Sequence, residues 1–242
     1  MSKTVSYADF KGNGYMQIQA TESDTLQDLT NSSYTFSVIC KPEYIKPIPL
    51  EEFYEDYALI VRSGLHTGIF YSTVNVFTGK IWEDNKDNEH TIHTEWWDGK
   101  IIHLIFSVNY TEKKLNFYTN GEKKYEVSLP KNVNLYKYPT ENSDYYVGCA
   151  NPYSDDFNHF YNGKIYEVSM WNTELKDTEV STLYNNKFDM DLTENLKDYK
   201  SSENLVGYWN FDWIVDNKIF DESLSDNVGT LSDNVKIRTE EI

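Results

Sequence analysis

Aromatic rings lie beside polar side chains at two places in this sequence where a sugar could bind. Trp96 and Trp97 follow the polar run EDNKDNEHTIHTE, and Tyr153, Phe157 and His159 lie in the acidic stretch ANPYSDDFNHFYNG. Concave ligand sites typically combine aromatic walls with a few polar groups. We therefore predict Trp96, Trp97, Tyr153, Phe157 and His159 as ligand-binding residues.

The tryptophan pair also has a structural interpretation. Adjacent residues of a strand point to opposite faces, so at least one of the two rings could face solvent. In the alternative, Trp97 belongs to the core and Trp96 covers an edge. Trp82, Trp171 and Trp209 lie in expected strands and are predicted to be core residues.

Signals for catalysis are weak in this sequence. It contains no Gly-x-Ser-x-Gly element, no P-loop and no Cys-x-x-Cys pair. The acidic run EEFYED, residues 51–56, follows a proline-rich stretch and is expected to be a solvated loop. His90 and His93 are three residues apart and cannot share one face of a strand. His103, within an apolar run, is predicted to be a packed histidine, and we predict a protein that is not an enzyme.

Charge and composition exclude several classes of partner. The formal net charge of −17 would repel a phosphate backbone, which argues against nucleic acid. No apolar run reaches the roughly 18 residues of a membrane span, so no membrane insertion is expected. The first residues, MSKTVSYADF, have no apolar core of a secretory signal. Two cysteines are too few for a disulfide framework; Cys40 is expected in the core, and its pairing with Cys149 is left open.

Short alternating runs separated by turn signals predict an all-β fold, which suits a chain with 20 Tyr. Asn120-Gly121 between Leu115–Thr119 and Lys124–Leu129 predicts a type I′ hairpin. Asn162-Gly163 predicts a second turn before a strand with Tyr166, Val168 and Met170 on one face. Further strands are expected at 15–20, 34–40, 57–63, 68–77, 100–108, 144–150, 164–171 and 205–212.

One helix is expected after the strand that ends at Trp171. Asp177 fits an N-cap, and Glu179 suits the first turn, where a carboxylate favours the helix dipole. Val180 and Leu183 then follow at helical spacing. Asn185-Asn186 ends the helix, and residues 187–204 are predicted to be irregular.

This strand and helix resemble the signature of the laminin-G and pentraxin branch of the concanavalin A-like jelly roll. The matching residues are Phe160, Gly163, Ile165, Val168, Trp171, Leu175, Glu179, Val180, Leu183 and Tyr184. The segments DFKGNGYMQI, YTFSVICKP, WDGKIIHLIFSVNYTEKKLNFYTNGE and LVGYWNFD…DESLSDNVGTL resemble other elements of the family in the same order, with Cys40 departing from a common pattern. The resemblance implies one antiparallel jelly-roll β-sandwich over residues 1–242, with residues 204–242 completing it.

The resemblance also implies a calcium site. In pentraxins the acidic calcium-binding loop holds the position of residues 150–163, and Asp155, Asp156 and Asn158 carry the oxygen ligands that Ca²⁺ takes. The pentraxin Glu-Gln-Asp run is missing here, and a solvated acidic turn is the alternative.

Fold alone does not assign a function, because one fold hosts many. We expect a non-catalytic, lectin-like recognition module that binds carbohydrate or another surface ligand such as a protein. The alternative is a structural subunit of a particle, a capsid, tail or fibre decoration that packs against neighbours or copies of itself and binds no sugar. Relatives of the fold are usually extracellular, whereas this sequence shows no signal peptide, so we expect display on a virus or phage particle.

Overall fold

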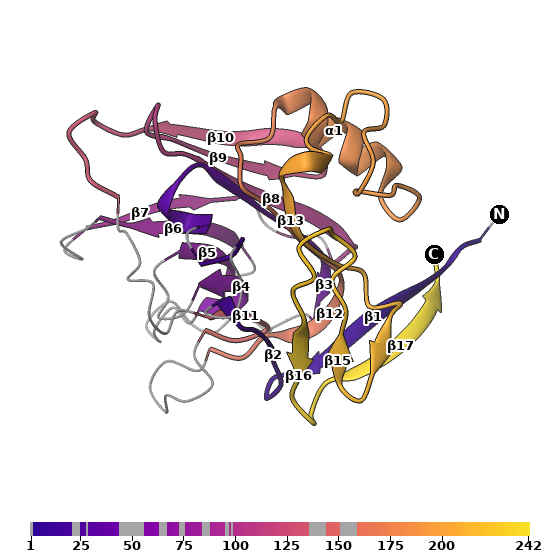
Figure 1. Cartoon of the computed structure of the whole chain (residues 1–242). Helices are drawn as coiled ribbons and strands as arrows, with labels where there is room; N and C mark the ends of the chain where they lie inside the picture. The colour runs from indigo at the N-terminus through magenta and orange to yellow at the C-terminus, as the bar shows by residue number, and fades with distance from the viewer. Residues whose placement is uncertain are drawn as a thin grey trace.

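The computed structural model describes residues 2–20, 25–27, 29–43, 56–62, 67–72, 76–83, 88–94, 97, 99–135, 144–150 and 159–242. Two antiparallel sheets form a β-sandwich, and the single α-helix of the described chain lies against one of them (Figure 1). The predicted jelly-roll class is confirmed.

Sheet A has eight strands in the order β10-β9-β8-β3-β12-β1-β17, and β13 pairs with β12 beside this path. Its strands are β1 (Thr4–Lys11), β3 (Tyr34–Pro42), β8 (Ile102–Asn109), β9 (Lys114–Thr119), β10 (Glu122–Ser128), β12 (Asn162–Trp171), β13 (Leu205–Trp209) and β17 (Lys236–Glu241). The first and last strands of the chain therefore pair with each other, and the backbones of Lys3 and Ile242 exchange two hydrogen bonds of 3.2 and 2.9 Å.

Sheet B has nine strands in the order β14-β15-β16-β2-β11-β4-β5-β6-β7. Its strands are β2 (Met16–Ile18), β4 (Asp56–Arg62), β5 (Thr67–Ser72), β6 (Phe77–Trp82), β7 (Glu89–His93), β11 (Tyr145–Val147), β14 (Ile214–Val215), β15 (Lys218–Ile219) and β16 (Gly229–Leu231). Two short 3-10 turns, η2 (Leu29–Asn31) and η3 (Ser202–Asn204), complete the elements with α1 (Asp177–Asn186).

The core lies between the sheets and is filled by alternate residues of each strand. Phe36, Val38 and Cys40 of β3 are fully buried there, as the alternation of that strand predicts. Cys149 is buried in a separate small cluster, so the two cysteines are free thiols rather than a disulfide.

Turn signals predicted one turn correctly and one wrongly. Asn120 and Gly121 have φ of 52° and 79° and join β9 to β10, which confirms the type I′ hairpin. Asn162 and Gly163, in contrast, belong to β12. Gly163 has φ of 145°, and a Cβ there would lie 2.7 Å from the Lys41 carbonyl oxygen. This glycine permits a close backbone approach.

Strand β12 also departs from simple alternation. Its register against β3 shifts between Ile165 and Glu167, which is the mark of a β-bulge. Ile165 and Val168 both point into the core, while Tyr166 packs in a cluster on the outer side. The prediction that Tyr166 shares a face with Val168 and Met170 was therefore wrong, because the bulge inserts one residue.

Helix α1 begins one residue away from the predicted cap. Lys176 is the N-cap residue, not Asp177, and its backbone N–H donates to the Glu179 carboxylate over 3.0 Å. Glu179 also accepts from Lys200 N at 3.0 Å and Ser201 Oγ at 2.7 Å. One buried carboxylate therefore fixes both the start of α1 and the loop that returns beneath it. The helix ends at Asn186, as predicted.

Candidate functional site

Among the predicted ligand-binding residues, the described chain contains Trp97 and His159. Trp97 is 6% exposed in the main core, its indole N–H donates to Lys100 O over 2.7 Å, and its ring meets Tyr71 edge-on at 6.0 Å. This is the core alternative for Trp97, and it leaves no open ring face for a sugar. His159 is half-buried with φ of 43°, and its carbonyl accepts from Ala58 N over 3.1 Å.

The other predicted residues, Trp96, Tyr153, Asp155, Asp156, Phe157 and Asn158, lie outside the described residues. Within the described part of the chain, no group of three or more His, Cys, Asp or Glu side chains is placed to hold a metal ion. Nor is any helix of that part long and apolar enough to span a membrane.

A set of aromatic and polar side chains lines the outer face of sheet B at its β6–β7 edge. Core residues alternate along both strands, with Phe77 and Ile81 in β6 and Ile92 in β7. The residues between them point outward and pair across the strands as Thr78 with His93, Lys80 with Thr91 and Trp82 with Glu89. We call these six residues the β6–β7 face.

Trp82 is half-buried on the β6–β7 face rather than in the core, so that prediction was wrong, whereas Trp171 and Trp209 are fully buried as predicted. Its neighbours carry hydrogen-bonding groups. Lys80 lies 3.6 Å from the Glu89 carboxylate and 5.2 Å from the centre of the Phe70 ring.

The remaining side chains of the β6–β7 face are held by short contacts. Thr91 Oγ1 donates to Glu89 Oε1 over 2.6 Å, and the His93 ring nitrogen Nδ1 bonds Thr78 Oγ1 at 3.0 Å. These contacts hold a carboxylate, an ammonium and an imidazole beside an indole on one hydrogen-bonded strand pair. Such an arrangement can stack on an apolar ligand face and hydrogen-bond hydroxyl groups.

The outer face of sheet A differs because α1 and the following loop cover it. Trp171 of β12, Val180 and Leu183 of α1, and Met190 and Leu192 of the loop form a second buried cluster. Polar side chains lie beneath this cover. Buried polar groups of this kind can form a catalytic site.

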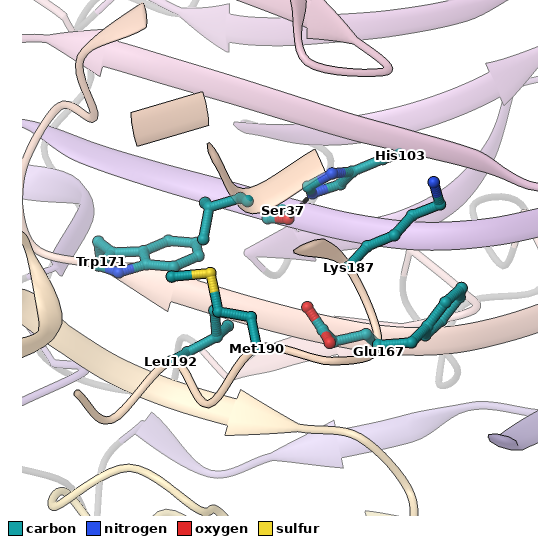
Figure 2. A pocket seen from close by; sticks show the side chains of 9 residues that line it. Ser37, His103, Glu167, Trp171, Lys187, Met190 and Leu192 are labelled. Carbon is teal, nitrogen blue, oxygen red and sulfur yellow. Dashed lines mark hydrogen bonds between the residues drawn. The ribbon is translucent and has the colours of Figure 1, made fainter. Parts of the chain in front are cut away.

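Ser37, His103 and Glu167 line a small cavity under this cover (Figure 2). His103 Nε2 bonds Ser37 Oγ at 2.8 Å, as expected for a packed histidine. Burial, with a smaller effect of the nearby Lys187, lowers the pKa of His103 to about 3, so its imidazole is neutral.

The arrangement is not that of a nucleophile and its base. His103 Nδ1 is buried and has no hydrogen-bond partner in the described chain, so no carboxylate orients the ring. The cavity volume is about 10 Å³, which is room for one water molecule and not for a substrate. Ser37 and His103 are therefore structural polar residues.

Glu167 is the feature that sequence reasoning missed on this face. Desolvation raises its pKa to about 8, against a hydrogen bond from Tyr208. That hydrogen bond is long, at 3.5 Å. No sequence pattern indicated the bulge that turns Glu167 outward, whereas the alternation in FTGKIW and EHTIH could have revealed the β6–β7 face.

Comparison with known proteins identifies the family. The profile of the family described as the concanavalin A-like lectin/glucanases superfamily matches residues 10–181, and the chain belongs to this superfamily. No curated protein sequence matches it significantly.

Several solved structures share the fold. A provisionally assigned carbohydrate-binding protein of Bacteroides ovatus has 15% identity and a TM-score of 0.71 over 99% of this chain, which spans 62% of that protein. A heptameric pentraxin of Limulus polyphemus has 11% identity and a TM-score of 0.56, over 96% of this chain and 94% of its own. The CBM40 of Ruminococcus gnavus IT-sialidase, bound to α2,3-sialyllactose, has 12% identity and a TM-score of 0.56 over 76% of this chain and 98% of its own. At these identities the similarity shows the fold.

Proposed function

We propose that this chain is a non-catalytic, lectin-like recognition module that binds carbohydrate, or another surface ligand, through the β6–β7 face. The observation that carries the proposal is the array of Trp82 with Lys80, Glu89 and His93 on the outer side of sheet B. The indole can stack on the C–H face of a sugar ring, and the polar groups can bond its hydroxyls. The similarity to a sialyllactose-bound CBM40 supports a glycan as the ligand.

The proposal includes the predicted loop residues. Trp96, Tyr153, Phe157 and His159 would extend the ligand contacts, and Asp155, Asp156 and Asn158 would supply oxygen ligands to Ca²⁺. Their contribution is separable from that of the β6–β7 face, since calcium dependence belongs to the acidic stretch alone.

A glycan array with purified protein, run with calcium and with a chelator, tests this function. We expect binding that falls on the order of tenfold or more in Trp82→Ala, because stacking area is lost. Tyr125→Ala is the matched control, since Tyr125 is a 41% exposed aromatic residue on β10 of the opposite sheet. Loss of binding in chelator would support the calcium site, and loss in Trp96→Ala would add that ring to the site. No binding in either buffer would contradict the glycan proposal.

One observation favours a second function, assembly into a particle. Trp213, Ile214 and Val215 expose 55, 37 and 51% of their surface on and beside the β14–β15 hairpin. Exposed apolar groups of this kind can mark a protein contact. Light scattering would show a copy-to-copy contact as an oligomer that dissociates in a Trp213→Ser/Val215→Ser variant. A monomer at all concentrations would argue against self-assembly.

We propose a virus or phage particle surface as the setting for either function. Antibody labelling of intact purified particles tests it, and labelling seen only after disruption would contradict display on the surface.

A further inference from the structure

The edge of β12 carries two different partner strands, and a pocket lies where they separate. Along β12, pairing with β1 ends at Ile165 opposite Ala8, and pairing with β13 starts at Val168 opposite Trp209. Tyr166 and Glu167, the bulge residues, lie between these two pairings. The resulting pocket between β1, β12 and β13 has a volume of about 80 Å³. We call it the β1–β13 pocket.

Its floor and walls combine aromatic rings with carboxyl groups. Tyr166, Glu167 and Tyr208 are 1, 8 and 5% exposed, while Asp212 is an exposed lining residue. Phe188 forms another wall, with its ring 5.8 Å from that of Tyr166 at an angle of 67°. The pocket is thus aromatic at its sides and acidic from its floor to its exposed side.

The carboxyl group of Glu167 has no cation paired with it in the described chain. Lys3 lines the β1–β13 pocket itself and Lys187 lines the adjoining cavity, but the ammonium groups of both are engaged elsewhere. Lys187 holds its ammonium 4.0 Å from the centre of the Tyr184 ring, and Lys3 pairs with Asp189 at 2.7 Å and donates to the Phe188 carbonyl. The nearby Glu222 carboxylate contributes further negative potential to Glu167.

We propose that the β1–β13 pocket binds an organic ammonium group, with Glu167 as its counter-ion, Asp212 at the exposed side, and Tyr166, Phe188 and Tyr208 as aromatic walls. Carboxylates and ring faces are the two chemistries that attract such a cation, and both are strongest when partly desolvated. A metal ion is a poor alternative, because no group of three metal-ligating side chains is placed in the described chain. The net charge of −17 also favours a cationic ligand over an anion.

The ammonium could come from a lysine side chain or from an amino sugar. The volume of about 80 Å³ admits the ammonium end of either and not a whole oligosaccharide. The site is on the opposite sheet from the β6–β7 face, so this inference is independent of the glycan proposal.

Binding should also move one proton. The Glu167 carboxyl, protonated at pH 7 because burial raises its pKa, ionises when a cation arrives beside it. Its proton leaves to solvent, so each bound ammonium releases close to one proton. A ligand without the charge releases none.

The test uses the full chain in amine-free solution at pH 7. Calorimetric titration with Nα-acetyl-lysinamide should show binding with a dissociation constant on the order of 1 mM or tighter. Nα-acetyl-norleucinamide, which lacks the ammonium, should not bind. A pH-stat titration should record the proton release. A second titration compares glucosamine with N-acetylglucosamine, which lacks the ammonium. Tighter binding of glucosamine than of both N-acetylglucosamine and Nα-acetyl-lysinamide would identify an amino sugar as the source of the ammonium.

Three variants locate the site. Glu167→Gln should weaken binding on the order of tenfold and abolish proton release, while Asp212→Asn should weaken it about threefold without risk to folding. Glu203→Gln removes one exposed carboxylate that does not line the pocket and should change neither readout. The proposal would be overturned if the uncharged analogue bound equally well or if affinity were unchanged in both pocket variants. It would also be overturned if neither Nα-acetyl-lysinamide nor glucosamine bound.

Discussion

The two outer faces of the sandwich treat polar side chains in opposite ways. On sheet A, Ser37, His103 and Glu167 lie beneath α1 and its following loop, at 1, 3 and 8% exposure. On sheet B, Lys80 and Trp82 are half-buried, and Glu89 and His93 are exposed. Figure 1 shows the asymmetry in the fold, with α1 over the β8–β10 side of sheet A.

The comparison distinguishes polar side chains that stabilise the fold from polar side chains that a ligand can contact. A buried polar group must find a partner inside the protein, and Ser37 with His103 does so. On the β6–β7 face Thr78 is buried, but Lys80, Trp82, Glu89 and His93 remain partly or fully exposed, where a ligand can reach them. Substitutions of Ser37 and His103 should therefore change stability, and substitutions on the β6–β7 face should change glycan binding.

Replacing one tryptophan on each face should reveal this difference between the faces most strongly. Trp171 is fully buried, and its indole donates to Tyr199 Oη over 2.9 Å. Trp171→Ala should lower the free energy of unfolding by about 3–5 kcal/mol. Trp82→Ala should cost about 1 kcal/mol or less, because the ring is only half-buried, while glycan binding falls on the order of tenfold or more. Urea denaturation measures both costs, and equal costs would contradict the distinction between the faces.

Local signals predicted much of the fold, but tertiary contacts overrode some of them. Asn120-Gly121 forms its hairpin because the turn residues alone specify a type I′ turn. Asn162-Gly163 carries the same signal and instead lies in a strand, since the glycine admits the Lys41 backbone. The pair Trp96-Trp97 could not be resolved by periodicity, and only packing against Tyr71 places Trp97 inside.

The next largest expected effect is a pH dependence of the free energy of unfolding that comes from Glu167 on sheet A. Its pKa is about 8 in the folded chain against an ordinary 4.5, so the folded state holds the proton more tightly. Stability from this group is complete below pH 4.5 and is lost as the pH rises to about 8, on the order of a few kcal/mol.

Glu167→Gln should remove that loss. The variant, measured against the parent chain by urea denaturation from pH 5 to pH 9, should be relatively more stable at the alkaline end. The difference between the two chains cancels the titration of His103 and other groups. A constant difference across this range would show that Glu167 does not titrate in it.

The site was harder to predict than the fold for a physical reason. A bulge adds one residue to β12 and turns Glu167 to the outer face. The residue types around it, KIYEVSMW, still read as an ordinary strand, so the sequence does not reveal the bulge. The outward residues of β6 and β7, in contrast, follow strict alternation and were hidden only because EDNKDNEHTIHTE reads as a loop.

A smaller effect is expected from the hydrogen bond beneath α1. Ser37→Ala leaves His103 Nε2 without its partner in a buried site and should cost about 1–3 kcal/mol. The double variant Ser37→Ala/His103→Leu should cost less than the sum of the single changes, because both polar groups are then absent. Strict additivity in this denaturation cycle would mean that the pair is not coupled, and glycan binding should stay unchanged throughout.

The smallest stability effect belongs to the ion pair on the β6–β7 face. Lys80 and Glu89 lie 3.6 Å apart near solvent, so their coupling in a cycle of Lys80→Gln and Glu89→Gln should be about 0–1 kcal/mol. Glycan affinity should nevertheless fall about fivefold in each single variant, because these groups would contact the ligand. Lys123→Gln, which removes partly exposed pairs with Glu126 on β10 and Asp177 on α1, is the charge-matched control and should leave affinity intact. Equal affinity losses for Lys80→Gln and Lys123→Gln would mean that general charge, and not the β6–β7 face, attracts the ligand.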